Sequence, residues 1–169
     1  GREGFLKAMV SENHYRNYKN KINKILENKK YHINDVYFKK YPICRHLHSS
    51  IDAIINIYNQ MVLDGTKTED IHLINIKTYE IAAEHDDYNP QSIEAVRQSL
   101  PVTSALGILN GGLNLNDMEI DSETISMASK INIDIDRDFN KLYPGKRPSE
   151  ITVVTNKKKY ISKVNLPKG

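Results

Sequence analysis

SSIDAIINIYNQMVLDG, residues 49–65, is the stretch that decides the fold of this 169-residue chain. Its apolar side chains recur at three- and four-residue steps, the spacing of one helix face: Ile51, Ile54, Ile55, Tyr58, Met61 and Val62. Ser49 or Ser50 can serve as the N-cap, and Asp64-Gly65 is a typical helix end. The stretch therefore predicts an amphipathic helix with one face on a core.

Beyond this helix the apolar period changes from about 3.6 residues to two, which is typical of strands with one buried face. Isoleucines alternate with polar residues over 74–79 and 131–135. Residues 151–155 and 160–164 flank Asn156-Lys157-Lys158-Lys159 and predict a hairpin with a solvated tip.

Helices are expected between these strands. Residues 92–98 and 102–109 have helical patterns separated by Pro101, and Gly111-Gly112 ends the second. Asp121 or Ser122 can cap a short helix that reaches Lys130. One-sided strands mixed with amphipathic helices predict an α+β fold, a mainly antiparallel sheet with helices packed on one face.

The chain before residue 46 is basic. Residues 1–45 hold eleven Lys or Arg against four Asp or Glu, a net charge of +7, whereas residues 46–169 carry −4. Residues 14–28 predict a basic amphipathic helix and 32–38 a strand. Interleaved tyrosines make a nucleic-acid or acidic-ligand surface one interpretation, and a solvated helix face is the other, which makes nucleic acid the less favoured partner.

Composition restricts the class of protein. The chain is 39% hydrophobic and 27% charged, as in soluble globular domains, and no apolar run approaches the ~20 residues of a membrane span. We therefore expect a cytoplasmic protein with no membrane partner. The single cysteine, Cys44, excludes an internal disulfide, and the glycine-rich motifs of nucleotide-binding loops do not occur.

The densest group of chemically active residues is FKKYPICRHLH, residues 38–48, directly before the strong helix. A helix N-terminus favours anions, and Lys39, Arg45 and His48 would add donors for a carboxylate or phosphate. The alternative is structural, with Lys40 and Arg45 solvated, Cys44 a small buried residue and His48 a core or capping residue.

The residue types of this segment also allow two other kinds of chemistry. Cys44, His46 and His48 would share one face of an extended chain, but no second ligand cluster has zinc spacing, so no metal is expected. Cys44 could act as a nucleophile with His46 or His48 as base, or be an inert buried thiol. Residues 134–138 resemble part of a calcium loop, which strand alternation explains better.

At this segment the sequence resembles the MmgE/PrpD family, which includes 2-methylcitrate dehydratases, cis-aconitate decarboxylases and iminodisuccinate epimerases. Residues 38–53 are similar to its F-K-P-Y-P-x-C-R-x-x-H-x-x-I-D-A signature. Further similar segments follow in the family's order, and the resemblance covers nearly the whole chain: Gly4–Leu6, Glu69–Ile76, Ser99–Leu106 and Tyr143–Val153.

The resemblance implies that residues 1–169 are a single domain, the smaller α+β domain of proteins that also contain a large helical domain, absent from this chain. The active site would lie between the two domains and act without metal or other cofactor on a small di- or tricarboxylic acid. The partners implied are this polycarboxylate and the helical domain, and a homodimer is left open.

Individual roles are also implied by the resemblance. Lys39 matches the signature lysine expected to bind a substrate carboxylate and take part in catalysis. Arg45 would be an anion clamp, and His48 a proton-transfer or hydrogen-bonding group. Tyr88 lies where decarboxylase-like members place an active-site tyrosine. Lys40, Cys44 and His46 are expected site neighbours, with Lys40 in place of the family's proline and Cys44 where decarboxylases carry a histidine.

Two functions follow from these observations. The first is a carboxylate-binding domain of a metal-independent lyase or isomerase, dehydratase-like or decarboxylase-like. The alternative is a non-catalytic binding or assembly module with an anion-binding basic face. The sequence leaves open whether the reaction is dehydration, decarboxylation or epimerisation.

Overall fold

The computed structural model describes residues 21–25, 27, 33 and 36–168, in a chain that divides into two units, 1–37 and 38–169. In the first unit residues 21–25 and 27 are helical, as predicted, and the rest of the helix expected over 14–28 lies outside the described residues. The strand expected over 32–38 is wrong where it can be checked. Ile33 is in a 3₁₀ turn and 36–38 have no regular structure, because no strand of the described sheet pairs with them.

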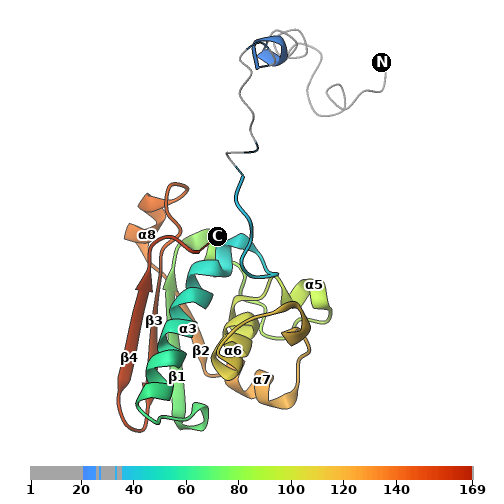
Figure 1. The fold of residues 1–169 in the computed structure, drawn as a ribbon. Coiled ribbons are helices and arrows are strands. Elements are labelled where there is room, and N and C mark those ends of the chain that lie inside the picture. Colours follow the sequence, from blue (N-terminus) through green and yellow to red (C-terminus); the bar gives the residue numbers. More distant parts are fainter. Residues whose placement is uncertain (1–20, 26, 28–32, 34–35, 169) are drawn as a thin grey trace. The chain divides into compact units, whose positions relative to one another are not determined.

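The second unit is built on a four-stranded sheet with the order β2-β1-β3-β4 (Figure 1). The strands are β1 (Ile71–Thr78), β2 (Ile131–Ile135), β3 (Ser149–Thr155) and β4 (Lys159–Val164). β1 and β2 are parallel, and the other two pairings are antiparallel. The mainly antiparallel sheet of an α+β fold is therefore confirmed.

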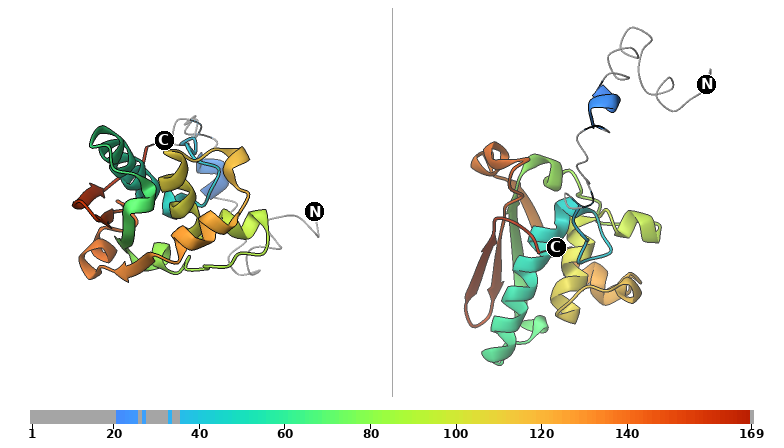
Figure 2. Two further views of the ribbon diagram at one scale, coloured as in Figure 1. Left: turned by 90° about the horizontal axis from the view of Figure 1, so that it is seen from below. Right: turned by 45° about the horizontal axis from the view of Figure 1, so that its top comes forward.

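Three helices cover one face of this sheet: α3 (His48–Leu63), α6 (Leu100–Asn110) and α7 (Ser122–Ala128). In Figures 1 and 2, α3 lies over β3 and β4, with α6 beside it and α7 beyond α6. Isoleucines of α3 and of the strands form the core between the layers. None of the helices in the described part of the chain has the length and apolarity needed to cross a bilayer.

The opposite sheet face carries an alternating row of charges. Lys77 lies between Asp134 of β2 and Glu150 of β3, and Glu150 pairs in turn with Lys163 of β4. Opposite charges on neighbouring strands stabilise a sheet. This face therefore remains polar while the other forms the core.

The predicted central helix is confirmed, but its predicted N-cap is wrong. The short helix η2 (Arg45–Leu47) runs directly into α3, so Leu47 occupies the cap position and Ser49 and Ser50 lie in the first turn. Their hydroxyls make tertiary bonds instead, Ser49 to the Arg147 carbonyl and Ser50 to Ser149 Oγ at 2.9 Å. The two serines thus connect α3 to the start of β3.

The helices after β1 also follow the sequence with small corrections. Pro101 lies in the first turn of α6 rather than before it, as a proline can at a helix start. α5 (Ile93–Val96) precedes it, and Asp121 caps α7 as predicted. Gly111 ends α6 with φ 65°, and a Cβ there would collide with the Tyr58 ring.

Two features were not predicted. Helix α8 (Arg137–Leu142) begins at Asp136, whose carboxylate accepts two backbone N–H bonds. Its Phe139 packs with Tyr79 and with Ala82 of α4 (Glu80–Ala83) in a small second core. The hairpin tip is also not simply solvated, because Lys158 pairs with Asp64 at 2.5 Å and Lys157 donates to the Gly65 carbonyl at 2.8 Å.

Candidate functional site

The start of α3 is unusually polar for a buried helix end. His48, Ser49, Ser50 and Asp52 are between 0 and 4% exposed. They lie among η2, the end of the chain after β4, and the loop that precedes β3. Buried polar groups need hydrogen-bond partners. The hydrogen bonds of these residues therefore show which side chains stabilise the fold and which can bind a ligand.

One set of bonds surrounds the Asp52 carboxylate, and we call Lys40, Tyr41, Asp52 and Lys168 the Asp52 network. Tyr41 donates its hydroxyl to Oδ1 at 2.7 Å, and the Lys168 backbone N–H donates to Oδ2 at 2.8 Å. Lys40 Nζ lies 3.5 Å from Oδ1. Burial and the bond to Asp52 raise the pKa of Tyr41. Both carboxylate oxygens have partners, so Lys40 is occupied here.

Arg45 and His48 form a second contact. Arg45 Nη1 lies 3.2 Å from His48 Nδ1 and donates to the Lys168 carbonyl at 3.1 Å. A guanidinium only donates, so Nδ1 is the acceptor and the His48 proton is on Nε2. Burial, and then the Arg45 charge, lower the pKa of His48 to about 4. The ring is neutral at neutral pH and orients Arg45; its role in proton transfer stays a prediction.

Lys39 joins this pair from the segment before η2. Its Nζ donates to the Ile43 carbonyl at 3.1 Å, and its charge contributes to lowering the pKa of His48. The structure therefore brings Lys39, Arg45 and His48 together around the first turn of α3. Lys39 is exposed and His48 is buried, so the cationic groups form the outer part of this arrangement.

His46 of η2 also belongs to a set of rings, together with Tyr79, His85 and Tyr143, which we call the histidine–tyrosine cluster. His46 Nδ1 is 2.7 Å from the Tyr79 hydroxyl. His46 and His85 stack with ring centres 6.1 Å apart, and Tyr79 and Tyr143 stack at 5.2 Å. The cluster joins residues of η2, the end of β1, the loop after α4 and the loop after α8.

The electrostatics of the cluster are cationic. Burial lowers the pKa of His46, and the charges of Arg147 and His85 act in the same direction. Burial raises the pKa of Tyr79, and Arg147 and Arg45 oppose this. No carboxylate is among the described groups that shift either residue. Arg147 lies over Tyr143, its guanidinium carbon 5.7 Å from the ring centre, so two arginines border a neutral aromatic surface.

Cys44 contacts this cluster and not the Arg45–His48 pair. Its Sγ is 3.6 Å from His85 Nε2, so the imidazole beside the thiol is His85 and not His46 or His48, the two considered from the sequence. Its backbone N–H donates to the Arg97 carbonyl at 2.9 Å. Within the described residues no three His, Cys, Asp or Glu side chains are grouped as metal ligands.

Tyr88 lies elsewhere. Its hydroxyl donates to the carbonyl of Ile131, the first residue of β2, at 2.9 Å, and burial raises the pKa of Tyr88. Tyr79, in contrast, directly follows Thr78, the partner of the last residue of β2. The Tyr88 hydroxyl therefore bonds at the first residue of β2, whereas Tyr79 follows the strand residue paired with the last residue of β2. The catalytic role expected for Tyr88 stays a prediction.

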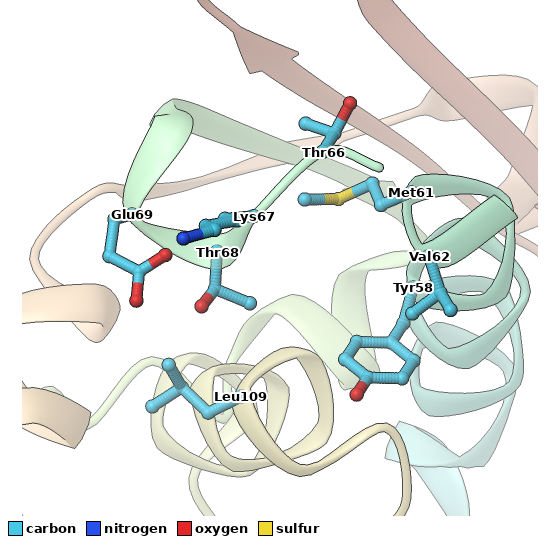
Figure 3. Close-up of a pocket in the computed structure, with 8 residues that line it drawn as sticks. All are labelled: Tyr58, Met61, Val62, Thr66, Lys67, Thr68, Glu69 and Leu109. Atoms are coloured by element: carbon cyan, nitrogen blue, oxygen red, sulfur yellow. The ribbon is translucent and has the colours of Figure 1, made fainter. Parts of the chain in front are cut away.

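A cavity of about 310 Å³ lies near the other end of α3 (Figure 3). Tyr58 of α3 and Leu109 of α6 line one side, with Lys67 and Glu69 of the following loop opposite. Met61 in its wall is thirteen residues from His48, about 20 Å along the helix axis. The cavity is therefore not part of the α3 N-terminal site.

These observations define a class: an α+β domain with helices on one face of a mixed sheet and a cationic, aromatic group of side chains at one end. The family model for the MmgE/PrpD C-terminal domain matches residues 41–169. The chain belongs to the MmgE/PrpD family, as its signature segment predicted. The match includes Arg45, His48 and Tyr88, while Lys39 and Lys40 precede it. A search of curated proteins finds no match to the chain.

Reasoning from sequence did not assign roles to Tyr79, His85, Tyr143 and Arg147. Tyr143 and Arg147 belong to the YPGKRP segment that resembles the family, which was a signal of their importance. Tyr79 and His85 gave no such signal. The alternating pattern placed Tyr79 among the polar residues of its strand, whereas its side chain is only 1% exposed.

Proposed function

We propose that this chain is the carboxylate-binding domain of a cytoplasmic, metal-independent lyase or isomerase that acts on a small di- or tricarboxylic acid. The reaction is dehydratase-like or decarboxylase-like. The other half of the active site comes from a large helical domain of the same protein. The observation that carries the proposal is the convergence of Lys39 and Arg45 at the start of α3 in a member of the MmgE/PrpD family.

The arrangement suits anionic substrates. Lys39 and Arg45 present ammonium and guanidinium groups beside a helix N-terminus, which favours negative charge. His48 accepts a hydrogen bond from Arg45 at 3.2 Å and, unlike a carboxylate, does not cancel the charge of the guanidinium. His48 therefore supports the proposal as a residue that positions Arg45.

The chemistry follows from the charge of such a substrate. Removal of a proton beside a carboxylate creates a second negative charge, and fixed cationic donors stabilise that state more than the ground state. Lys39 and Arg45 would provide this stabilisation. Loss of one such donor typically lowers turnover by about 10²–10³-fold.

The test is turnover by the protein in which this chain is joined to its helical domain. 2-Methylcitrate, cis-aconitate and iminodisuccinate are offered to the wild type and to the Lys39→Ala and Arg45→Ala variants. Lys77→Ala and Arg97→Ala remove the same kinds of charge elsewhere and should leave turnover unchanged. Unchanged turnover in both site variants, on a substrate that the wild type accepts, would contradict the site assignment.

The same protein distinguishes the alternative of a non-catalytic module. If it binds polycarboxylates but converts none of the three, the carboxylate site stands and the catalytic proposal is wrong. Binding to a nucleic acid that weakens steeply with salt would favour the module instead. The isolated chain should fold and show no turnover, since it carries only one half of the site.

A further inference from the structure

Arg147 is held in place by its backbone on two sides. Its N–H donates to the Asn165 carbonyl at 3.1 Å, and its own carbonyl accepts from the Ser49 hydroxyl in the first turn of α3. The guanidinium lies over the Tyr143 ring. Residue 147 is therefore fixed between α3, the chain after β4 and the histidine–tyrosine cluster, so its side chain starts from a defined position.

The Arg147 side chain lacks an acidic partner. Its buried Nε has no hydrogen-bond partner, and no Asp or Glu pairs with the guanidinium, among the residues that the structure describes. Arg97 also has a buried Nε without a hydrogen-bond partner among these residues, but its Nη1 pairs with Glu94 at 2.5 Å. Burial removes water from a cation, and the free energy of this desolvation is normally offset by pairing with an anion. Arg147 therefore needs an anion that the described part of this chain does not supply.

The surroundings of Arg147 select the kind of anion. Tyr143 stacks on Tyr79, and the neighbouring imidazoles of His46 and His85 can donate hydrogen bonds. Arg45 acts on the same Tyr79 hydroxyl from η2. An arginine fork matches the two oxygens of a carboxylate in one plane. Two arginines bordering one phenol thus suit a molecule with two separate carboxylates.

We propose that Arg147 binds a second carboxylate of the substrate, while Lys39 and Arg45 bind the first. This inference rests on the proposed function and assigns a residue of this chain to the second carboxylate of the di- or tricarboxylic acid. The histidine–tyrosine cluster contacts Arg147 through Tyr143 and includes His46, the neighbour of Arg45 in η2, so His46 and Tyr79 can contact the substrate backbone. A substrate with one carboxylate gains nothing from Arg147.

The test is binding by the 169-residue chain, measured by calorimetry with tricarballylate, butyrate and inorganic phosphate as probes. We expect Arg147→Gln to lower the affinity for tricarballylate about tenfold or more, the usual effect of losing a hydrogen bond to a charged group. Arg147→Lys should recover part of this loss. Arg97→Gln, which removes the same charge from a paired arginine, should bind as the wild type does. Circular dichroism confirms that each variant is folded.

Nuclear magnetic resonance gives an independent readout. The imidazole signals of His46 and His85 should shift on addition of tricarballylate to the wild type and not to Arg147→Gln, whereas the signal of His72, which is exposed and bonded to Asn156, should not move in either. Equal tricarballylate binding by wild type and Arg147→Gln overturns the inference. The inference is also overturned if Arg147→Gln loses butyrate binding to the same extent as tricarballylate binding, or if the wild type binds phosphate as tightly as tricarballylate.

Failure here is separable from failure of the proposed function. If the chain binds no tricarballylate at about 10 mM, a concentration that detects even millimolar affinity, the second-carboxylate site is wrong, whatever the turnover assay shows. If Arg45→Gln weakens binding and Arg147→Gln does not, the proposed function stands and only the role of Arg147 is rejected.

Discussion

The Asp52 network and Arg147 hold charged groups in opposite situations. In the Asp52 network a buried carboxylate has a partner for each oxygen. Beside the histidine–tyrosine cluster, Arg147 has a buried nitrogen with no partner among the described residues. The first arrangement stabilises the fold, because each buried polar group is satisfied. The second contributes little to stability and leaves a cation available to a ligand.

This difference separates structure from function within one short sequence. Residues 38–53 contain both Asp52, which fixes the end of the chain at Lys168, and Lys39 and Arg45, which point to anion binding. A motif match alone treats these residues alike. Both carboxylate oxygens of Asp52 are bonded within the fold, which assigns this acid a structural role.

Asp52→Ala tests the structural side and should have the largest effect. The substitution leaves the Tyr41 hydroxyl and the Lys168 N–H without an acceptor in a buried place, so we expect a loss of about 3 kcal/mol in the free energy of unfolding. Urea denaturation measures it. Asp64→Ala, which removes an exposed carboxylate paired with Lys158, is the control and should cost far less. Equal losses would contradict a special role for the network.

The buried His48 predicts how the stability of this side depends on pH. Its pKa is about 4 in the folded state against 6.5 when unfolded, so only the unfolded chain gains the proton between these values. The contribution of His48 to the free energy of unfolding is fully present above pH 6.5. It is lost as the pH falls towards 4, by at most about 3 kcal/mol.

The measurement is the slope of unfolding free energy against pH in that window. His48→Asn keeps an acceptor for Arg45 but cannot titrate, so its slope should be smaller than that of the wild type. His72→Asn, on an exposed residue, should keep the wild-type slope. A wild-type slope in His48→Asn would mean that this imidazole is already protonated in the fold.

Much of the fold could be predicted from local sequence. The apolar stripe of α3, the alternation in β2 and the turn between β3 and β4 are each encoded within about fifteen residues, and all three are confirmed. The errors have tertiary causes. Ser49 was expected to cap α3, but η2 continues into that helix and frees the hydroxyl for Arg147. The strand expected over 32–38 has no partner strand in the described sheet.

The site was predictable only in part. Arg45 and His48 are one helix turn apart, and Lys39 bonds to the Ile43 carbonyl just before that turn, so contacts local in sequence bring the three together. Contacts between distant residues leave no local pattern: His46 meets Tyr79 across 33 positions, and Cys44 meets His85 across 41. Residues close in sequence can also make different contacts. His85 belongs to the cluster, whereas Tyr88, three residues later, bonds to the first residue of β2.

Tyr41→Phe refines the comparison by removing one bond from the Asp52 network. The lost hydroxyl donates to a buried carboxylate, so we expect a cost of about 2 kcal/mol. Tyr160→Phe makes the same chemical change where the acceptor is the neutral Thr66 hydroxyl at 2.8 Å, and should cost about 1 kcal/mol. Thermal or urea unfolding of the two variants gives the difference. A larger cost for Tyr160→Phe would show that the charge of Asp52 adds nothing to this bond.

Arg147→Met should have the smallest effect on stability, although it removes a charge from a partly buried residue. Methionine keeps the length and apolar contact of the side chain over Tyr143. The loss of the cation–π contact, about 0.5–1 kcal/mol, is offset by no longer desolvating an unpaired cation. We therefore expect the free energy of unfolding to change by less than about 0.5 kcal/mol. A loss comparable to that of Asp52→Ala would show that Arg147 is a structural residue, and the contrast between the Asp52 network and Arg147 would not hold. A stable variant that no longer binds tricarballylate would instead establish that this cation is retained for a ligand rather than for the fold.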